Sequence, residues 1–166
     1  HANRASFNNH LGVPLTLAAL PDAPLAAVQE IGMNAPGEIR TLSTLAQPDI
    51  AVITRIADSH AGFFDSLDDI AATKAEIFDG LTAGGTAILN ADDAYFTFLS
   101  GRATNAGAGP IIGFCAAASA EARLLDVTAD DTGTNVRADI LGTGLAFRMG
   151  TRGQHWAHNA MAMLAA

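Results

Sequence analysis

The chain has 166 residues, of which 49% are hydrophobic and 16% charged, so it can bury a sizeable core without a disulfide or a zinc site. Its formal net charge of -8 disfavours nucleic acid as a partner, because an acidic surface repels phosphates. The single cysteine, Cys115, excludes an intramolecular disulfide, and no apolar run approaches the roughly 20 residues that a membrane span needs. No secretory leader is recognisable, so we expect a cytoplasmic protein.

The first two thirds of the chain alternate between helical and strand patterns. Pro14 suits the first turn of a helix, and Ser66 followed by Asp69 resembles a capping box at the start of the clearest helical pattern. The apolar run at 49–56 is typical of a strand covered on both faces. In chain order we expect a helix at 12–20, a strand at 25–31, a helix at 37–46, a strand at 49–56, a helix at 66–81, a strand at 86–90, a helix at 92–99 and a strand at 111–115.

The pattern changes after about residue 120. Short alternating strands are expected at 122–128, 135–141 and 145–149, separated by the turn signals Asp-Asp-Thr-Gly and Gly-Thr-Gly, and a helix at 155–166. The whole pattern predicts an α/β fold. Its sheet is mostly parallel, doubly wound and flanked by helices, with a small antiparallel meander near residues 122–150.

Lys74, the only lysine, lies within the apolar stripe of the helix expected at 66–81. A lysine that points inward loses hydration, which lowers its pKa and favours the neutral amine. Its stem can pack on the core while the ammonium reaches water or a carboxylate. Alternatively, the amine is functional, as a nucleophile or as a site of modification.

Glu30 and His60 lie near the expected carboxyl ends of two strands, where ligands bind in open α/β sheets. A carboxylate at such a place suits Mg²⁺, although Glu30 could equally be a solvated strand-end acid. His60 alone would be an ordinary loop residue. With Lys74, however, these side chains come from the ends of adjacent units and could converge on one point.

Familiar phosphate-loop and serine-hydrolase motifs are absent. No GxxxxGK[ST] string and no Gly-x-Ser-x-Gly string occurs. Cys115 lies in an apolar strand pattern and is expected in the core. Trp156, beside His155, could either cover a flat ligand or pack at the start of a helix.

Several long strings resemble the central domain of the Mur ligases. They are FNNHLGVPLTLAALP (7–21), VQEIGMNAPGEIRTLSTLAQPDIAVIT (28–54), SHAGFFDSLDDIAATKAEIFDGL (59–81), GGTAILNADD (84–93) and GQHWAHNAMAMLAA (153–166). The resemblance is strong over 6–93 and 153–166 and weak between 100 and 151.

The resemblance implies an ATP-dependent ligase of peptidoglycan synthesis that joins a carboxylate to an amine through an acyl phosphate. The NAPGEI string (34–39) is typical of the branch that adds D-Ala-D-Ala to a UDP-MurNAc-tripeptide. Two alternatives remain. One is a non-catalytic module that binds metal, nucleotide or a partner, and the other is a relative with another acceptor, of the folylpolyglutamate or cyanophycin type.

The resemblance also implies metal-site roles. Glu30 matches the glutamate that binds Mg²⁺, and His60 matches the histidine of a second metal site. Lys74 matches a lysine that CO₂ carbamylates and that helps to hold that metal. His60 and Lys74 are therefore the expected catalytic residues. Arg55 and Asp58 depart from the family pattern beside this site.

The remaining implied roles concern the nucleotide and the substrate. Asn159 matches the asparagine that contacts adenine, with His155 nearby, and Asn8 and Asn9 match a pair on the substrate side of the phosphate loop. In the family, a first strand and the phosphate loop precede the segment matched here, and further domains flank the central one. We therefore expect residues 1–166 to be an incomplete central domain that is inactive alone and self-associates through an unpaired sheet edge.

Overall fold

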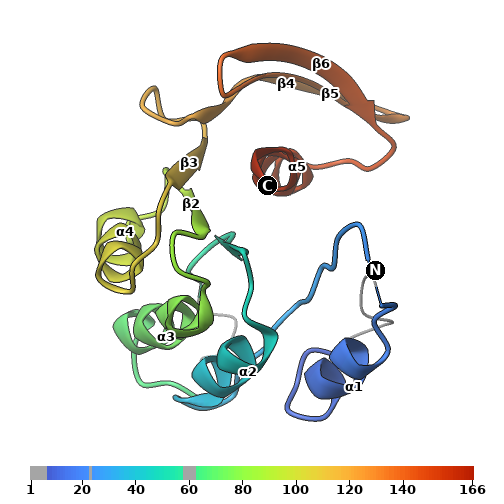
Figure 1. Ribbon diagram of the computed structural model, residues 1–166. Helices are drawn as coiled ribbons and strands as arrows, with labels where there is room; N and C mark the ends of the chain where they lie inside the picture. Colours follow the sequence, from blue (N-terminus) through green and yellow to red (C-terminus); the bar gives the residue numbers. More distant parts are fainter. Residues whose placement is uncertain (1–6, 23, 58–62) are drawn as a thin grey trace.

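The computed structural model describes residues 7–22, 24–57 and 63–166, and its centre is a six-stranded sheet (Figure 1). Neighbours from β1 to β4 are parallel, whereas β4, β5 and β6 are antiparallel. The strands, in the order in which they lie, are β1 (Ile50–Ile53), β2 (Thr86–Asn90), β3 (Ile111–Cys115), β4 (Ala122–Asp130), β5 (Gly133–Ile140) and β6 (Thr143–Met149). The predicted fold class is confirmed.

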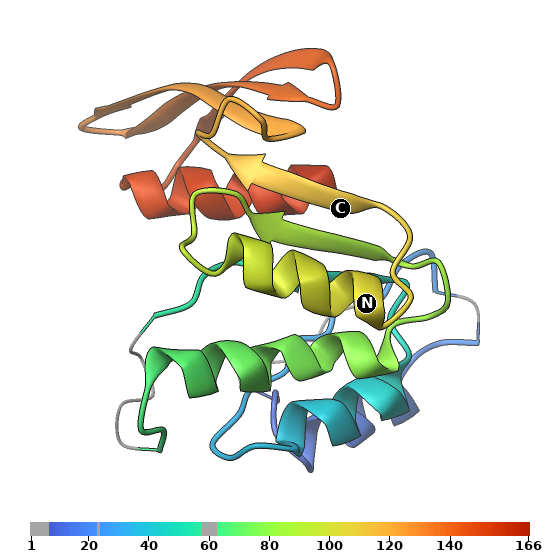
Figure 2. The same ribbon diagram turned by 90° about the vertical axis from the view of Figure 1, so that its left-hand side faces the viewer.

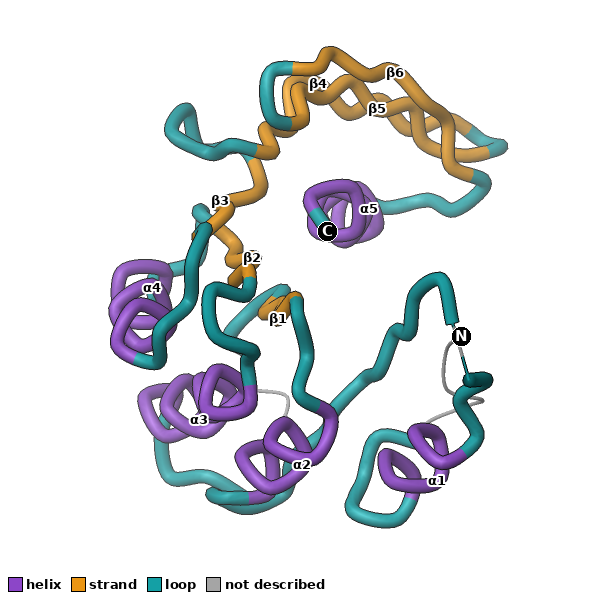
Figure 3. The backbone as a smooth tube through the Cα atoms, viewed as in Figure 1, coloured by secondary structure: helices purple, strands orange, loops and turns teal. Residues whose placement is uncertain are grey.

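Helices cover both faces of this sheet. They are α1 (Gly12–Ala18), α2 (Glu38–Ala46), α3 (Leu67–Lys74), the 3-10 helix η1 (Ala75–Gly80), α4 (Phe96–Asn105) and α5 (Gln154–Ala165). Figure 2 shows α4 and the α3–η1 helix running alongside β2 and β3, and Figure 3 shows α5 on the opposite side, beneath the meander. Within the described ranges, no helix is long and apolar enough to cross a membrane.

The core consists of two clusters on opposite faces of the sheet. Successive side chains of a strand point to opposite faces. Ala87 and Leu89 of β2 therefore belong to the cluster under α3, η1 and α4, whereas Ile88 belongs to the cluster under α5. Alternate side chains of one strand therefore pack against the helices on both faces of the sheet.

A buried carboxylate fixes the start of α2. Glu76 of η1, only 6% exposed, accepts hydrogen bonds from the backbone N–H of Gly37 at 2.9 and 3.0 Å and of Arg40 at 3.2 Å. These donors have no partner within the helix, and a negative charge is favourable at a helix N-terminus. Glu76 therefore joins α2 to η1.

The prediction of a strand at 25–31 is wrong. Only Val28 forms an isolated bridge there, and Leu25 and Val28 are 105% and 68% exposed. An apolar run alone cannot show whether a neighbouring strand and a covering layer exist. The strand at 49–56 also shortens to β1, whose Ile50 stays 40% exposed, so the expected cover on both faces is incomplete.

The helix expected at 66–81 begins as predicted and then changes type. Ser66 Oγ accepts from Asp69 N at 3.1 Å, which confirms the cap. After Lys74 the helix tightens to the 3-10 helix η1, and a Cβ on Gly80 would lie 2.1 Å from the backbone of Ser43 in α2. The next helix begins at Phe96, four residues later than expected, and continues to Asn105.

Both edges of the sheet lack a further strand among the described residues, since β1 pairs with β2 and β6 with β5. Unpaired edge N–H and C=O groups favour pairing with another chain. We expect the apparent mass in static light scattering to rise with concentration. A constant monomer mass up to high concentration would contradict this prediction.

Candidate functional site

Two of the implied site residues contact each other. Asn8 Nδ2 donates to Glu30 Oε1 at 2.8 Å, and the N–H of Gly32 donates to the carbonyl of Asn8 at 2.8 Å. A Cβ on Gly32 would lie 3.0 Å from the Asn8 side chain. The glycine therefore lets residues 30–32 lie against Asn8, which orients the exposed Glu30 carboxylate.

Asn9 has a different task. Its Oδ1 accepts from the N–H groups of Leu11 and Gly12 at 3.1 and 2.9 Å, at the start of α1. A Cβ on Gly12 would lie 2.6 Å from the backbone of Phe7, so the chain can turn tightly only with glycine there. Asn9 thus stabilises the helix start through one oxygen, as capping asparagines do.

A cavity of about 280 Å³ adjoins this pair. It lies between residues 8–10, residues 32–34 and the first turns of α2. The Glu38 carboxylate beside it accepts from the N–H groups of Asn34 and Ala35 at 2.7 and 3.3 Å. Amide and carboxylate groups therefore border a cavity of small-ligand size.

Lys74 is the last residue of α3 and is partly buried, so the predicted inward position is confirmed. Burial lowers the pKa of its ammonium group from the ordinary lysine value. Lys74 forms no hydrogen bond or ion pair with a described residue. A larger fraction of the amine is therefore neutral at a given pH than on an exposed lysine.

The predicted convergence of Glu30, His60 and Lys74 is not tested, because His60 lies outside the described residues. No group of three or more His, Cys, Asp or Glu side chains suited to a metal occurs in the part of the chain that the structure describes. Mg²⁺ is commonly held by one or two carboxylates together with substrate phosphates and water. The exposed and oriented Glu30 carboxylate fits that mode.

The residues implied in nucleotide contact lie on α5. His155 and Asn159 are one turn apart, so they share a face of the helix, and both are exposed. The His155 ring lies 5.3 Å from the Trp156 ring, centroid to centroid, at 42°. Trp156 is 46% exposed, and its ring contact among the described residues is with His155.

Side chains at the carboxyl ends of the strands link neighbouring loops, and no such role was predicted for them from the sequence. Asn90 Nδ2 donates to the Thr54 carbonyl at 3.1 Å, and Asp93 Oδ2 accepts from Ile56 N at 2.8 Å. Asp92 accepts from the N–H groups of Ala116 and Ala117 at 3.0 and 2.8 Å. Residues 90–93, which we call the loop brace, thus join the loops after β1, β2 and β3. A local signal for this role exists in the sequence, because an amide side chain ends the strand and acid side chains follow it.

Cys115 ends β3 inside the core, as expected. It is fully buried, with a φ of 120° that is unusual for a residue other than glycine. Burial, reinforced by the Asp92 carboxylate, raises the pKa of its thiol to about 12. The thiol therefore stays protonated, which suits packing and not nucleophilic chemistry.

Comparisons with known proteins agree on one family. Residues 2–166 match the Mur ligase middle domain. The chain is 38% identical over 167 residues to the UDP-N-acetylmuramoyl-tripeptide–D-alanyl-D-alanine ligase of Bacillus subtilis, covering 100% of this chain and 34% of that protein. It is 36% identical over 124 residues to the ligase of the same name from Rickettsia prowazekii, covering 75% of this chain and 28% of that protein.

Solved structures show the same fold. MurF from Acinetobacter baumannii superposes with a TM-score of 0.91 at 28% identity, covering 99% of this chain and 35% of that chain. MurF from Thermotoga maritima, in complex with ADP, gives 0.84 at 20% identity, with 99% and 37% covered; this likeness concerns the fold alone. The chain spans about a third of the length of the curated relatives that it matches.

Proposed function

The chain belongs to the Mur ligase family, and we propose that it is part of the middle domain of an enzyme that adds D-Ala-D-Ala to a UDP-MurNAc-tripeptide. The observation that carries this proposal is the 38% identity to the Bacillus subtilis ligase across the whole chain. In the proposed reaction, the tripeptide carboxylate takes the γ-phosphoryl group of ATP, which forms an acyl phosphate and ADP. The amine of D-Ala-D-Ala then attacks the acyl carbon and releases phosphate.

Glu30 is the proposed ligand for Mg²⁺, which would shield the phosphate oxygens of ATP during transfer. Asn8 holds one oxygen of this carboxylate at 2.8 Å and so limits how it can rotate. Asn8 would thus act on the metal ligand, and Asn9 would shape the neighbouring α1 start. The cavity beside them is the proposed place where the substrate binds.

Lys74 is the proposed carbamylation site, with His60 beside it at a second metal. The ammonium group first loses one proton, and the neutral amine then attacks CO₂ to form a C–N bond and loses a second proton, so a cation becomes an anion. The lowered pKa of Lys74 supports this, because it enlarges the neutral fraction. His155 and Asn159, on the exposed face of α5, are the proposed nucleotide contacts.

We expect Lys74 to carry a carbamate near neutral pH when the chain is kept in ¹³C-bicarbonate, as observed by ¹³C NMR. Since burial lowers its pKa, the signal should begin at a lower pH than for an exposed lysine. Lys74→Met is the control, because it removes the only lysine and leaves the terminal amine. An unchanged carbamate signal in Lys74→Met would assign it to that amine and contradict the prediction.

Two other functions have less support. Folylpolyglutamate synthase of Mycobacterium tuberculosis has a TM-score of 0.75 at 24% identity, so it shares the fold alone and favours no acceptor. A non-catalytic module is the other alternative. The Mur ligase with D-Ala-D-Ala as acceptor is favoured because a relative so named matches 100% of this chain at 38% identity, whereas a relative named UDP-N-acetylmuramate–L-alanine ligase matches 72% at 34%.

A hybrid enzyme tests the proposal. The matched segment of the Bacillus subtilis ligase is replaced with these 166 residues, and ADP release is followed with UDP-MurNAc-tripeptide and D-Ala-D-Ala. Activity that needs both substrates and that Lys74→Met abolishes is expected. A folded hybrid without activity would contradict the proposal. The chain alone contains no GxxxxGK[ST] string, so we propose that it does not catalyse ligation by itself.

A further inference from the structure

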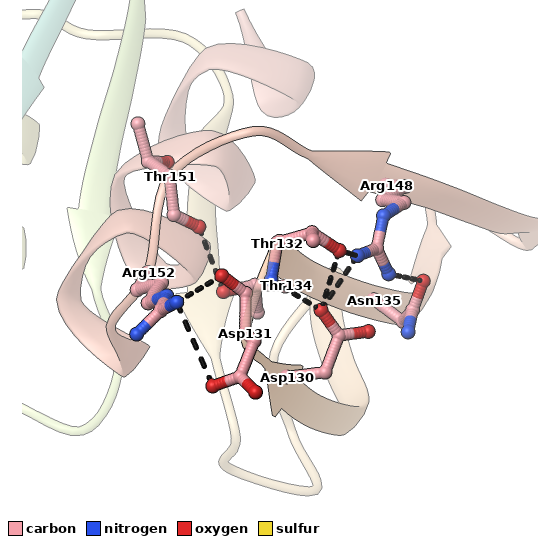
Figure 4. Close-up of polar contacts among 8 residues, drawn as sticks. All are labelled: Asp130, Asp131, Thr132, Thr134, Asn135, Arg148, Thr151 and Arg152. Carbon is pink, nitrogen blue, oxygen red and sulfur yellow. Dashed lines mark hydrogen bonds and ion pairs between the residues drawn. The ribbon is translucent and has the colours of Figure 1, made fainter.

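The segment that enters α5 is fastened to the turn between β4 and β5 (Figure 4). Arg148, near the end of β6, donates through Nη2 to Asp130 Oδ1 at 2.7 Å and to Thr132 Oγ1, and through Nη1 to Asn135 Oδ1 at 2.9 Å. One guanidinium therefore joins both ends of the β4–β5 turn to β6. Its planar, fixed set of donors makes such a junction directional.

Further contacts continue along the same segment. The hydroxyl of Thr134, which is fully buried, donates to the Thr151 carbonyl at 2.8 Å. Arg152 Nη2 donates to the Asp131 carbonyl and lies 3.6 Å from its carboxylate. We call this set the hairpin clasp; its members are Asp130, Asp131, Thr132, Thr134, Asn135, Arg148, Thr151 and Arg152.

Arg148 contributes more to holding the clasp than Arg152 does. Asp131 is fully exposed, so water and salt screen its pairing with Arg152. Arg148 and Asp130 are 41% and 49% exposed, and the Arg148 guanidinium, followed by the Thr132 N–H, holds the pKa of the Asp130 carboxyl well below its usual range. Arg148 and the buried Thr134 are therefore the firmer parts of the clasp.

Helix α5 needs such a fastening because of what it buries. Its buried residues are Ala157, Met161, Ala162 and Ala165. The small alanine side chains interlock little with the sheet and so do little to stop the helix from sliding along it. The methionine side chain adapts to irregular gaps. The segment before the helix also contains Gly150 and Gly153, which widen its conformational freedom.

We propose that the hairpin clasp sets the position of the first turn of α5, which makes Arg148 and Thr134 positioning residues for the nucleotide contacts His155 and Asn159. The nucleotide part rests on the proposed function. The fastening part rests only on the contacts in Figure 4. Neither positioning residue touches the nucleotide in this proposal; both act through the segment at 149–153.

The test uses the 166-residue chain and three variants. Arg148→Met removes the guanidinium, and Thr134→Val removes the hydroxyl at nearly constant volume. Arg137→Met is the matched control, since Arg137 is exposed on β5 and has no hydrogen bond or ion pair with a described residue. We expect amide hydrogen exchange across 150–157 to become about fivefold faster in the two clasp variants and to stay unchanged in the control. Acrylamide quenching of Trp156, the single tryptophan, should increase in parallel.

The hybrid ligase tests the nucleotide part. Arg148→Met should raise the KM for ATP about fivefold while kcat and the KM for D-Ala-D-Ala stay unchanged. Unchanged exchange in both clasp variants, or faster exchange with an unchanged KM for ATP, would overturn the inference. A hybrid that is inactive with Arg148 in place contradicts the proposed function instead, and hydrogen exchange in the chain still decides whether the clasp holds α5.

Discussion

Gly80→Ala should lower the free energy of unfolding by about 3 kcal/mol or prevent folding altogether. The added Cβ would lie 2.1 and 2.2 Å from the carbonyl carbon and oxygen of Ser43. These are backbone atoms of α2, so no side-chain rotation relieves the overlap, and α2 and η1 must move apart. Urea unfolding followed by circular dichroism measures the loss.

Two variants sharpen this prediction. Gly101→Ala in α4 is the matched control, because nothing lies within 4 Å of its added Cβ, and it should stabilise the chain by about 0.5–1 kcal/mol. Ser43→Ala combined with Gly80→Ala should not restore stability, since the backbone contact remains. If the double variant regained the stability of Ser43→Ala, the overlap would lie in the side chain and the argument would be wrong.

Glu76→Ala should also cost about 3 kcal/mol, because it leaves the backbone N–H groups of Gly37 and Arg40 without a buried acceptor. It also removes a negative charge from the N-terminus of α2. Glu76→Gln retains one carbonyl oxygen and should lose less. The unfolding midpoint in urea, compared at constant m-value, gives the difference.

Asp79 supplies the control for this second prediction. Its carboxylate accepts from Arg40 Nε at 2.7 Å, but the pair is partly solvated, so Asp79→Asn should cost less than about 1 kcal/mol. Equal losses for Asp79→Asn and Glu76→Ala would show that the arginine pairing, and not the backbone acceptor, holds α2 to η1.

The sequence predicts best where the signal is local. The turn strings between 128 and 145 give the meander, and Ser66 with Asp69 gives the start of α3, because each depends on neighbours within a few residues. The segment at 25–31 carries an apolar run but no strand, since a strand depends on a distant partner. The pairing of Glu76 with Gly37, across 39 positions, leaves no local trace.

In the candidate site, too, local features could be predicted from the sequence, whereas contacts between distant positions could not. Glu30 and Lys74 could be singled out from residue type and pattern, and the inward position of Lys74 is confirmed. That Asn8 holds Glu30 could not be predicted, because the contact spans 22 positions and depends on Gly32. The capping role of Asn9 needs no distant partner, because an asparagine just before a helical pattern is a local signal for a helix start.

The loop brace bears on the entropy of binding. Residues 90–93 bond to Thr54, Ile56, Ala116 and Ala117, so these positions after β1 and β3 are held by protein contacts before any ligand arrives. A ligand that meets an ordered surface does not have to pay for immobilising it. Affinity for a ligand that contacts the loop brace should therefore depend on the contacts made and little on ordering residues 90–93.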